Sequence, residues 1–513
     1  MITDDFFIVA IEFGSSKVTG IAGKRQLDGS LLVLAMAQEE SPSFINNGII
    51  FNVDKTSQCI RNIVDKLQKT LKKKISKVYV GIGGQSLRSK RNVIHIPLAE
   101  ETVVTQELID TILDANLSTD ISDCSILDVV PQEYKLGAQY QTDPVGVLSN
   151  DIEGRFLNII ARKSVHDVMA SCFKQAGVEV CDYYISPLSL ADGVLTDAEK
   201  RSGCVLVDLG AHTTTLLVYK GHLRHLVVLP IGSDNINKDL ISIYDIERTE
   251  AEALKLKYGV AYLEESENEE DQNIKLLDGR EISVKELREI IEARMREIIE
   301  NVLTQIRISG IMPSTLLAGV FLTGGGANMK ELNKAFVRVT KIEKFKIIKS
   351  VLFTVHSSLS EISLNNGRFN TVQSLLMKGT DNCCGGDIHE TPASLFEEDN
   401  VESRIESNVD GSTTATDGLT EIQRRQKAAE EAKKIKAAED AILAAEQAEK
   451  EKEAERVRLK EEKEARKKAT RERRKAKLQN NMFTKMAKKF GDTLKNIVAD
   501  NEETGQGKNN KAE

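Results

Sequence analysis

The chain has 513 residues, 41% of them hydrophobic, so it is long and apolar enough for several domains with packed cores. Its formal net charge of −8 hides an acidic run at 264–271 and a mixed-charge region at 421–477, and nothing in this pattern indicates a nucleic-acid partner. No cleavable signal is recognisable and no apolar run has the length that spans a bilayer, so we expect a cytosolic rather than a secreted or membrane-spanning protein.

A β-hairpin with a glycine at its tip is predicted near the start of the sequence. The apolar stretch 6–11 runs into an acidic residue, a spacer, a glycine, two hydroxyl residues and a lysine: Glu12, Phe13, Gly14, Ser15, Ser16 and Lys17. Glycine lets backbone N–H groups approach an anion without a Cβ in the way, and serine hydroxyls add donors. The carboxylate of Glu12 would repel a polyphosphate unless a cation lay between them, so the pattern indicates phosphate binding with Mg²⁺.

Strands and helices alternate after this hairpin. Apolar residues at helical spacing predict a helix at 56–71, and alternating stretches around a second helical pattern at 105–113 predict strands between 84 and 162. Helical spacing resumes at 164–176 and returns the chain to its first half. We therefore expect an α/β part that is interrupted by a smaller one.

The plan of the first hairpin is repeated in the second half. A strand at 205–207 leads into Asp208, Leu209, Gly210, Ala211, His212, Thr213 and Thr214. Two such tips that face each other would hold one nucleotide, with Glu12 and Asp208 sharing a Mg²⁺ through its waters.

A third glycine cluster follows the strand 320–322. It comprises Thr323, Gly324, Gly325, Gly326 and Ala327, and we expect Asn328 to open a helix. Before it, the pattern predicts a strand at 220–229, a helix at 247–257 and a long helix from Ser283 whose apolar stripe faces a core. A tight turn explains any one glycine cluster, but three in this order favour a site where backbone approaches phosphate and adenosine.

The composition changes after residue 379. Glycine, serine, threonine and acidic residues dominate as far as 418 and predict a disordered linker. Alanine, glutamate, lysine and arginine then fill 422–478, which favours a solvated single helix about 85 Å long over a coiled coil. The seven cysteines, including the vicinal Cys383 and Cys384, show no disulfide or metal-site spacing, so we expect buried thiols and no metal beyond nucleotide-bound Mg²⁺.

An amphipathic helix is predicted at 481–499. Its apolar face is edged by lysines, and the residues expected to contact a membrane are Met482, Phe483, Met486, Phe490, Leu494, Ile497, Lys485, Lys488 and Lys489. Apolar side chains that enter the acyl boundary while lysines meet headgroups suit an anionic lipid surface. The alternative is a helix that docks on a partner protein or on the globular body.

The ordered trio of glycine turns resembles the phosphate 1, phosphate 2 and adenosine motifs of the actin, Hsp70 and sugar-kinase superfamily. Within that superfamily, VVPQEY at 129–134, TDPVG at 142–146 and AEALKLKYGVAY at 251–262 are similar to the FtsA family of bacterial cell division proteins. The resemblance covers residues 5–380 and a short C-terminal stretch. It implies an α/β, actin-like two-lobed ATPase fold with the relocated subdomain of that family, followed by the linker, the charged helix and the terminal amphipathic helix.

The resemblance also implies a division into subdomains. These are subdomain 1A at 1–83, 163–198 and 365–380, subdomain 1C at 84–162, subdomain 2A at 199–231 and 310–364, subdomain 2B at 232–309, a linker at 381–420, a spacer at 421–480 and the membrane helix at 481–499. ATP and Mg²⁺ are the implied cofactors. The implied partners are FtsZ, bound through the region around 232–309, further copies of the chain in filaments, anionic lipid and other division proteins. The implied location is the cytoplasmic face of the inner membrane at the septum.

By the same resemblance, residues of the three turns contact the nucleotide and Mg²⁺. Glu252 and Lys255 match a helix near the ribose and base, although an ordinary surface pair at this spacing stays open. Ala211 and His212 replace residues that are small in the family, so the imidazole either donates to a phosphate or crowds the turn. Gln373 and Ser374 likewise stand where small residues are expected.

Other function classes remain open at this point. A small-molecule kinase of the same superfamily would need an added carboxylate as base, and a pilus-assembly relative would share the cleft but lack the tail. Any ATPase activity is expected to be weak.

Overall fold

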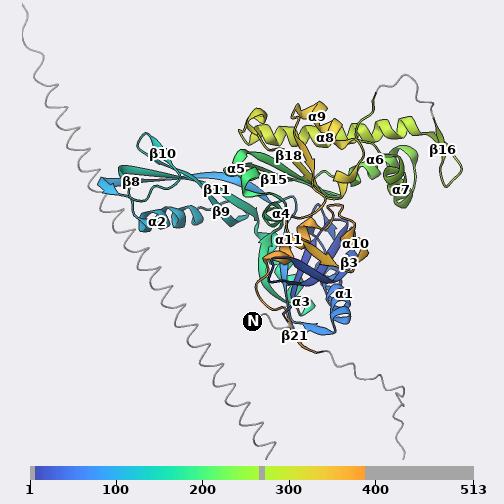
Figure 1. Cartoon of the computed structure of the whole chain (residues 1–513), viewed down its shortest axis with the longest axis horizontal. Coiled ribbons are helices and arrows are strands. Elements are labelled where there is room, and N and C mark those ends of the chain that lie inside the picture. The colour runs from blue at the N-terminus through green and yellow to red at the C-terminus, as the bar shows by residue number, and fades with distance from the viewer. Residues whose placement is uncertain (1–5, 265–271, 388–513) are drawn as a thin grey trace, which may run out of the picture. The chain divides into compact units, whose positions relative to one another are not determined.

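The computed structural model describes residues 6–264 and 272–387 (Figure 1). Two large sheets organise this part of the chain. Helices are α1 (Val53–Leu71), α2 (Gln106–Leu117), α3 (Lys163–Ala176), α4 (Ser186–Val194), α5 (Asp197–Ser202), α6 (Asp234–Tyr244), α7 (Arg248–Tyr258), α8 (Val284–Ile308), α9 (Leu332–Thr340), α10 (Ser360–Ser363) and α11 (Asn370–Lys378), with 3₁₀ turns η1 (Pro313–Thr315) and η2 (Gly325–Asn328).

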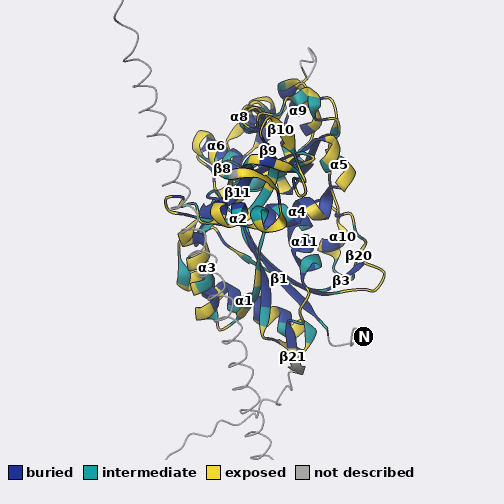
Figure 2. Ribbon diagram, turned by 90° about the vertical axis from the view of Figure 1, so that its left-hand side faces the viewer, coloured by how far each residue is buried: buried dark blue, intermediate teal, exposed yellow. Residues whose placement is uncertain are grey.

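The first sheet has the strand order β12-β7-β1-β2-β3-β20. Its strands are β1 (Ile8–Phe13), β2 (Lys17–Arg25), β3 (Leu31–Glu40), β7 (Lys77–Ile82), β12 (Glu179–Ile185) and β20 (Val355–Ser357). Strand β1 is almost continuously apolar and buried because helices cover both faces of the sheet. Helices α1 and α3 lie on one face, and α4 and α11 lie on the other (Figure 2).

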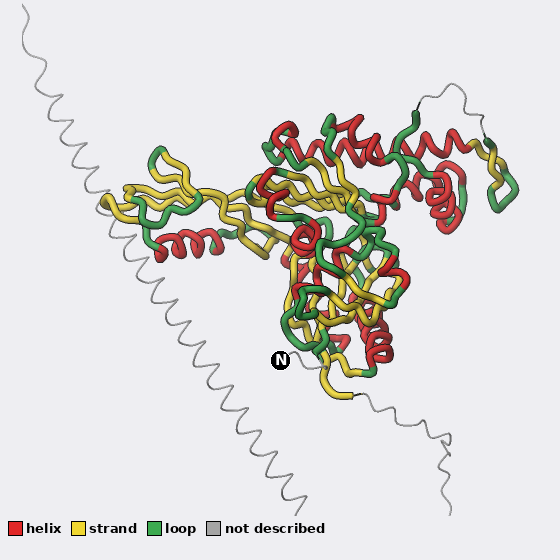
Figure 3. Tube along the Cα trace, viewed as in Figure 1, coloured by secondary structure: helices red, strands yellow, loops and turns green. Residues whose placement is uncertain are grey.

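The second sheet has nine strands in the order β10-β9-β11-β8-β15-β14-β13-β18-β19. They are β8 (Arg88–Val103), β9 (Cys124–Leu136), β10 (Gln139–Gln141), β11 (Leu148–Arg162), β13 (Cys204–Leu209), β14 (Thr214–Lys220), β15 (His222–Leu229), β18 (Gly319–Thr323) and β19 (Phe345–Ile347). The insertion between β7 and α3 supplies β8 to β11 (Figure 3). Strand β8 pairs with β15 of the second half at Arg88 and Val227. One sheet therefore runs through two predicted subdomains.

Separate apolar cores stabilise these parts. One lies between the first sheet and its helices, a second surrounds α8, a third lies around α4 and strands of the second sheet, and a smaller one holds α2 on the insertion. Helix α8 buries the predicted stripe, including Leu287, Ile291, Met295 and Ile306, and begins after Ser283, whose hydroxyl accepts from two first-turn amides. The short pairs are β4 (Ile45–Asn46) with β5 (Ile49–Ile50), β16 (Asn273–Lys275) with β17 (Glu281–Ser283), and β6 (Lys73–Ile75) with β21 (Cys384–Asp387).

Two local predictions were wrong. Asn328 ends the 3₁₀ turn η2 and does not open a helix; α9 begins at Leu332, after Glu331 takes the left-handed conformation with φ 57°. The linker does not start at 381, because Asn382 accepts a hydrogen bond from the Phe7 amide (2.9 Å) and β21 pairs with β6. Composition alone predicted disorder for this segment, but contacts with residues far away in the sequence order residues 382–387.

All seven cysteines are free thiols. Six of them are buried, which confirms the predicted burial for those six, and Cys181 is half-buried. Among the helices of the described residues, none combines the length and apolarity needed to cross a membrane. The remaining linker, the spacer 421–480 and the helix predicted at 481–499, with all its membrane-contact residues, lie outside the described residues.

Candidate functional site

Three glycine turns that are far apart in the sequence line one cavity of about 1370 Å³. The first belongs to the hairpin β1–β2, the second to the hairpin β13–β14, and the third follows β18. The predicted site residues on its lining are Glu12, Gly14, Ser15, Ser16, Lys17, Asp208, Gly210, Ala211, Thr213, Glu252, Lys255, Gly324, Gly325 and Gly326. The structure thus brings together most of the residues singled out from the sequence.

The two hairpin tips close in the same way. The Gly14 amide donates to the Lys17 carbonyl (3.1 Å), and the Gly210 amide donates to the Thr213 carbonyl (2.9 Å). A Cβ on Gly14 would stand 2.6 Å from the Lys17 oxygen, and one on Gly210 would stand 2.8 Å from the Thr213 oxygen. Each turn therefore needs its glycine, and the repeat seen in the sequence is a repeat in structure.

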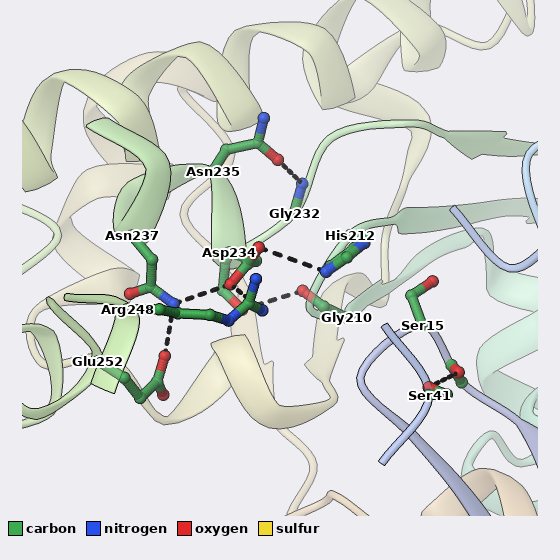
Figure 4. A network of polar contacts seen from close by, with 12 residues as sticks. Ser15, Ser41, Gly210, His212, Gly232, Asp234, Asn235, Asn237, Arg248 and Glu252 are labelled. Atoms are coloured by element: carbon green, nitrogen blue, oxygen red, sulfur yellow. Dashed lines mark hydrogen bonds and ion pairs between the residues drawn. The ribbon is translucent and has the colours of Figure 1, made fainter. Parts of the chain in front are cut away.

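Neighbouring segments fix the first tip. The Ser41 hydroxyl donates to the Gly14 carbonyl (2.7 Å), and the Ser15 hydroxyl accepts from the Gly48 amide (2.7 Å; both serines appear in Figure 4). Because Ser15 accepts that bond, its own proton stays available to an anion in the cavity. The turn is thus held in place before any ligand arrives.

Glu12 and Asp208 bring two carboxyl groups to the cavity. Each is partly exposed to it and otherwise surrounded by protein. Burial and then the charge of Asp208 raise the pKa of Glu12 to about 8, while burial raises the pKa of Asp208 to about 6. A divalent cation would stabilise both ionised forms, and paired carboxylates that bind through water suit Mg²⁺. The residues present therefore fit the predicted metal.

The third glycine turn packs directly on the second hairpin. Gly324 has φ 87°, and a Cβ there would stand 2.2 Å from Oδ1 of Asp208. Gly326 lies against Leu209 in the same way, with a Cβ position 3.1 Å from its carbonyl oxygen. Gly324 lets the backbone pass beside the carboxylate, which a side chain would prevent.

A loop at 366–368 completes this wall and was not predicted. The Asn328 side-chain amide donates to the Asn366 carbonyl (2.8 Å), Gly367 has φ 76°, and Arg368 lies beside Gly325 on the cavity lining. The Asn-Gly dipeptide is a turn signal that could have marked the loop. Its place beside the glycine turn depends on tertiary packing.

Glu252 and Lys255 form an ion pair between a partly exposed and a buried side chain. Lys255 is 8% exposed, and its Nζ lies 2.6 Å from Oε2 of Glu252. The side-chain amide of Asn237 donates to the same oxygen (2.6 Å). Both residues line the cavity on α7. A role of the pair at a ligand stays a prediction, because the Glu252 side chain is also exposed to solvent.

Two predicted contacts, His212 and Thr214, lie away from the cavity lining. The Thr214 hydroxyl is fully buried and donates to the Ile231 carbonyl (2.8 Å). The His212 ring turns toward α6, where its Nε2 lies 3.3 Å from Oδ2 of Asp234 (Figure 4). The expected roles of both side chains at a phosphate are corrected accordingly, because alternation along β14 points Thr214 inward and Asp234 holds the imidazole.

Comparison with known proteins agrees with this architecture. Residues 205–371 match the family model "Cell division protein FtsA", and residues 84–160 match the "SHS2 domain inserted in FTSA". The FtsA protein of Neisseria meningitidis serogroup B is 31% identical over 331 residues, covering 63% of this chain and 79% of the relative. The FtsA protein of Porphyromonas gingivalis is 27% identical over 337 residues, covering 64% and 70%.

A solved structure shares the fold at low sequence identity. The structure titled "PilM-PilN type IV pilus biogenesis complex" aligns with a TM-score of 0.52 at 12% identity, covering 72% of this chain and 97% of that one. The expected fold class, an actin-like α/β fold with an inserted subdomain, is confirmed. Because of the match to the inserted SHS2 domain and the similarity to FtsA proteins, the chain belongs to the FtsA family of cell division proteins.

Proposed function

We propose that the cavity binds Mg·ATP. The observation that carries this proposal is the pair of carboxylates that line one cavity together with two hairpin tips of the same geometry. The tips at 14–17 and 210–213 would hold the phosphates, Gly324 to Gly326 would border the adenosine, and Glu252 with Lys255 would meet the ribose. When bound, Mg²⁺ would neutralise charge on both phosphates and carboxylates.

Direct binding measurements test this proposal. The protein should bind ATP in the presence of Mg²⁺ and much more weakly when the metal is chelated, because Glu12 and Asp208 then face the phosphates without a cation. Calorimetric titration with and without Mg²⁺ measures the difference. Equal affinity in both conditions would contradict the assigned role of the carboxylates.

We further propose that the protein polymerises on the cytoplasmic face of the inner membrane and anchors FtsZ at the septum together with other division proteins. Family membership supports the division role, and the lysine-edged apolar pattern at 482–497 supports the lipid contact. One such helix binds lipid weakly, but copies held in a filament bind at high effective concentration. ATP would close the cavity, and the closed form would assemble and stay on the membrane.

A sedimentation experiment tests the adaptor role. Vesicles of anionic lipid should carry FtsZ into the pellet only when this protein is present, and more of it when Mg·ATP is added. Neutral vesicles serve as the control. Pelleting of FtsZ that does not depend on this protein would contradict the anchoring proposal.

A further inference from the structure

Asp234 is a buried carboxylate that joins the second hairpin to α6 and α7. It is 3% exposed and is the first residue of α6. Its Oδ1 accepts from Arg248 (2.7 Å) and from Asn237 (2.8 Å), and its Oδ2 faces Nε2 of His212 at 3.3 Å (Figure 4). Its backbone amide donates to the carbonyl of Ala211 (2.7 Å). Asp234 therefore contacts both the turn at 210–213 and the side chains of Asn237 and Arg248.

The contacts continue from Asp234 to the far wall of the cavity. The Asn237 amide that donates to Asp234 also donates to Glu252, which pairs with Lys255. Arg248, Glu252 and Lys255 line the cavity, whereas His212 does not. His212 can therefore affect a ligand only indirectly, either through the backbone of its own turn or through Asp234, and only the second route reaches α7.

The charge state of Asp234 makes this arrangement sensitive to loss of a partner. Burial opposes ionisation, but the facing His212 imidazole, the hydrogen bond from Asn237 and the charge of Arg248 hold the pKa of Asp234 at about 2. A buried carboxylate that loses one of its partners keeps its desolvation cost without the compensating contact. Removing His212 should therefore shift Asp234 toward Arg248 and disturb both ends of the chain of contacts.

We propose that His212 and Asp234 are a positioning pair that makes the phosphate turn and the α7 wall of the cavity one coupled unit. Order imposed on the turn at 210–213 then extends to Glu252 and Lys255, which lie on a different element. A ligand that orders the turn at 210–213 would therefore also order Glu252 and Lys255 for their own ligand contacts. The consequence for nucleotide affinity rests on the proposed binding of Mg·ATP, but the coupling itself is a property of the protein without ligand.

Four variants at two positions test the coupling. His212→Leu removes the polar contact, and His212→Gln keeps an N–H donor near the position of Nε2. His212→Asn places its donor near Nδ1, where Asp234 is out of reach, so it controls for side-chain polarity. Arg248→Met removes the second charged partner of Asp234, and it is combined with His212→Leu.

Amide hydrogen exchange without ligand is the first measurement. His212→Leu and His212→Asn should speed exchange about tenfold at both 210–213 and 251–258, while His212→Gln should stay close to wild type. Helix α3 serves as the internal control for global unfolding. Faster exchange at 210–213 with no change at 251–258 would overturn the proposal. If His212→Leu is too unstable to study, the contrast between Gln and Asn decides the question.

Affinity for Mg·ATP is the second measurement. His212→Leu should weaken binding about tenfold, and the double variant with Arg248→Met should lose less than the product of the two single losses, because either change alone already disrupts Asp234. A loss of affinity in the double variant equal to the product of the two single losses would contradict the coupling. If wild type does not bind Mg·ATP, the proposed function fails, while the exchange result still decides whether the coupling exists.

Discussion

At the scale of single residues, two carboxyl groups on the cavity lining are the main feature of the candidate site. Glu12 and Asp208 precede the glycine turns in sequence, and both were predicted because an acid beside a phosphate turn needs a cation. What the residues alone could not show is that Asp208 also touches the third turn at Gly324. That contact depends on how β13 and β18 pair.

Replacing Asp208 with Ala tests the metal role. Affinity for Mg·ATP should fall about tenfold or more, because one of the two carboxylates that hold the cation is lost. Calorimetry measures the change. Asp120→Ala removes an exposed carboxylate from the inserted domain and should leave affinity unchanged; an unaltered affinity in Asp208→Ala would show that the cavity is wrongly assigned.

The raised pKa values of the two carboxyls predict a pH dependence. In the unfolded chain both groups ionise near their ordinary pKa values. At intermediate pH the folded, ligand-free protein therefore binds more protons than the unfolded chain does. The stability that their neutral forms contribute is present at low pH and is lost as pH rises through about 6 and then about 8. The melting temperature should fall by a few degrees over this range.

Glu12→Gln is the control for this effect, because the amide stays neutral and should flatten the curve above about pH 6. Affinity for Mg·ATP in wild type should change in the opposite direction and rise with pH, since the cation requires ionised carboxylates. Thermal scans and titrations at several pH values measure both trends. A melting temperature that rises across the range in the absence of ligand would contradict the assignment.

At the scale of elements, local pattern predicted the two glycine hairpins and the helices α1, α2, α3, α7 and α8, but not α4, α5, α6 or α10. Helix α1 begins at Val53, three residues before the predicted start, because Asn52 caps it by accepting from the Lys55 amide. Gln373 and Ser374 lie buried on α11, and Ser374 fits because Gly193 opposite it has no side chain. The sequence marked these residues as unusual but could not identify the glycine that makes room for one of them.

The terminal helix gives the prediction at this scale. Phe490→Asp should weaken binding to anionic vesicles about tenfold or more, because it removes buried apolar area and adds a charge that lipid repels. Affinity for Mg·ATP should not change. Asn480→Asp adds the same charge outside the apolar face and is the matched control; equal vesicle binding by Phe490→Asp and wild type would remove the membrane assignment.

At the scale of the whole molecule, the continuous second sheet is the main feature that sequence patterns did not reveal. Residues of β8 reach across to the second half: the Ser89 hydroxyl accepts from the Leu226 amide (2.9 Å), and the Arg91 guanidinium donates to the Ser309 carbonyl. The inserted domain is therefore tied both to β15 and to the end of α8. The predicted subdomain boundaries assign β8 and β15 to different subdomains, although the two strands pair in one sheet.

Assembly on membranes gives the prediction at the molecular scale. Recruitment to anionic vesicles should rise more steeply than linearly with protein concentration when Mg·ATP is present, because each added copy brings another anchor. Sedimentation across a concentration series measures this. Asp208→Ala should restore a linear dependence, and identical recruitment of monomeric and assembled forms would contradict the mechanism.

The sequence by itself determined the three glycine turns, their acidic partners and the periodic helices, because each depends on residues that are close together along the chain. Tertiary structure decided which of those side chains meet in one cavity, where His212 and Thr214 point, and how the inserted strands extend the second sheet. These outcomes depend on contacts between residues far apart in sequence, and such contacts leave no local pattern.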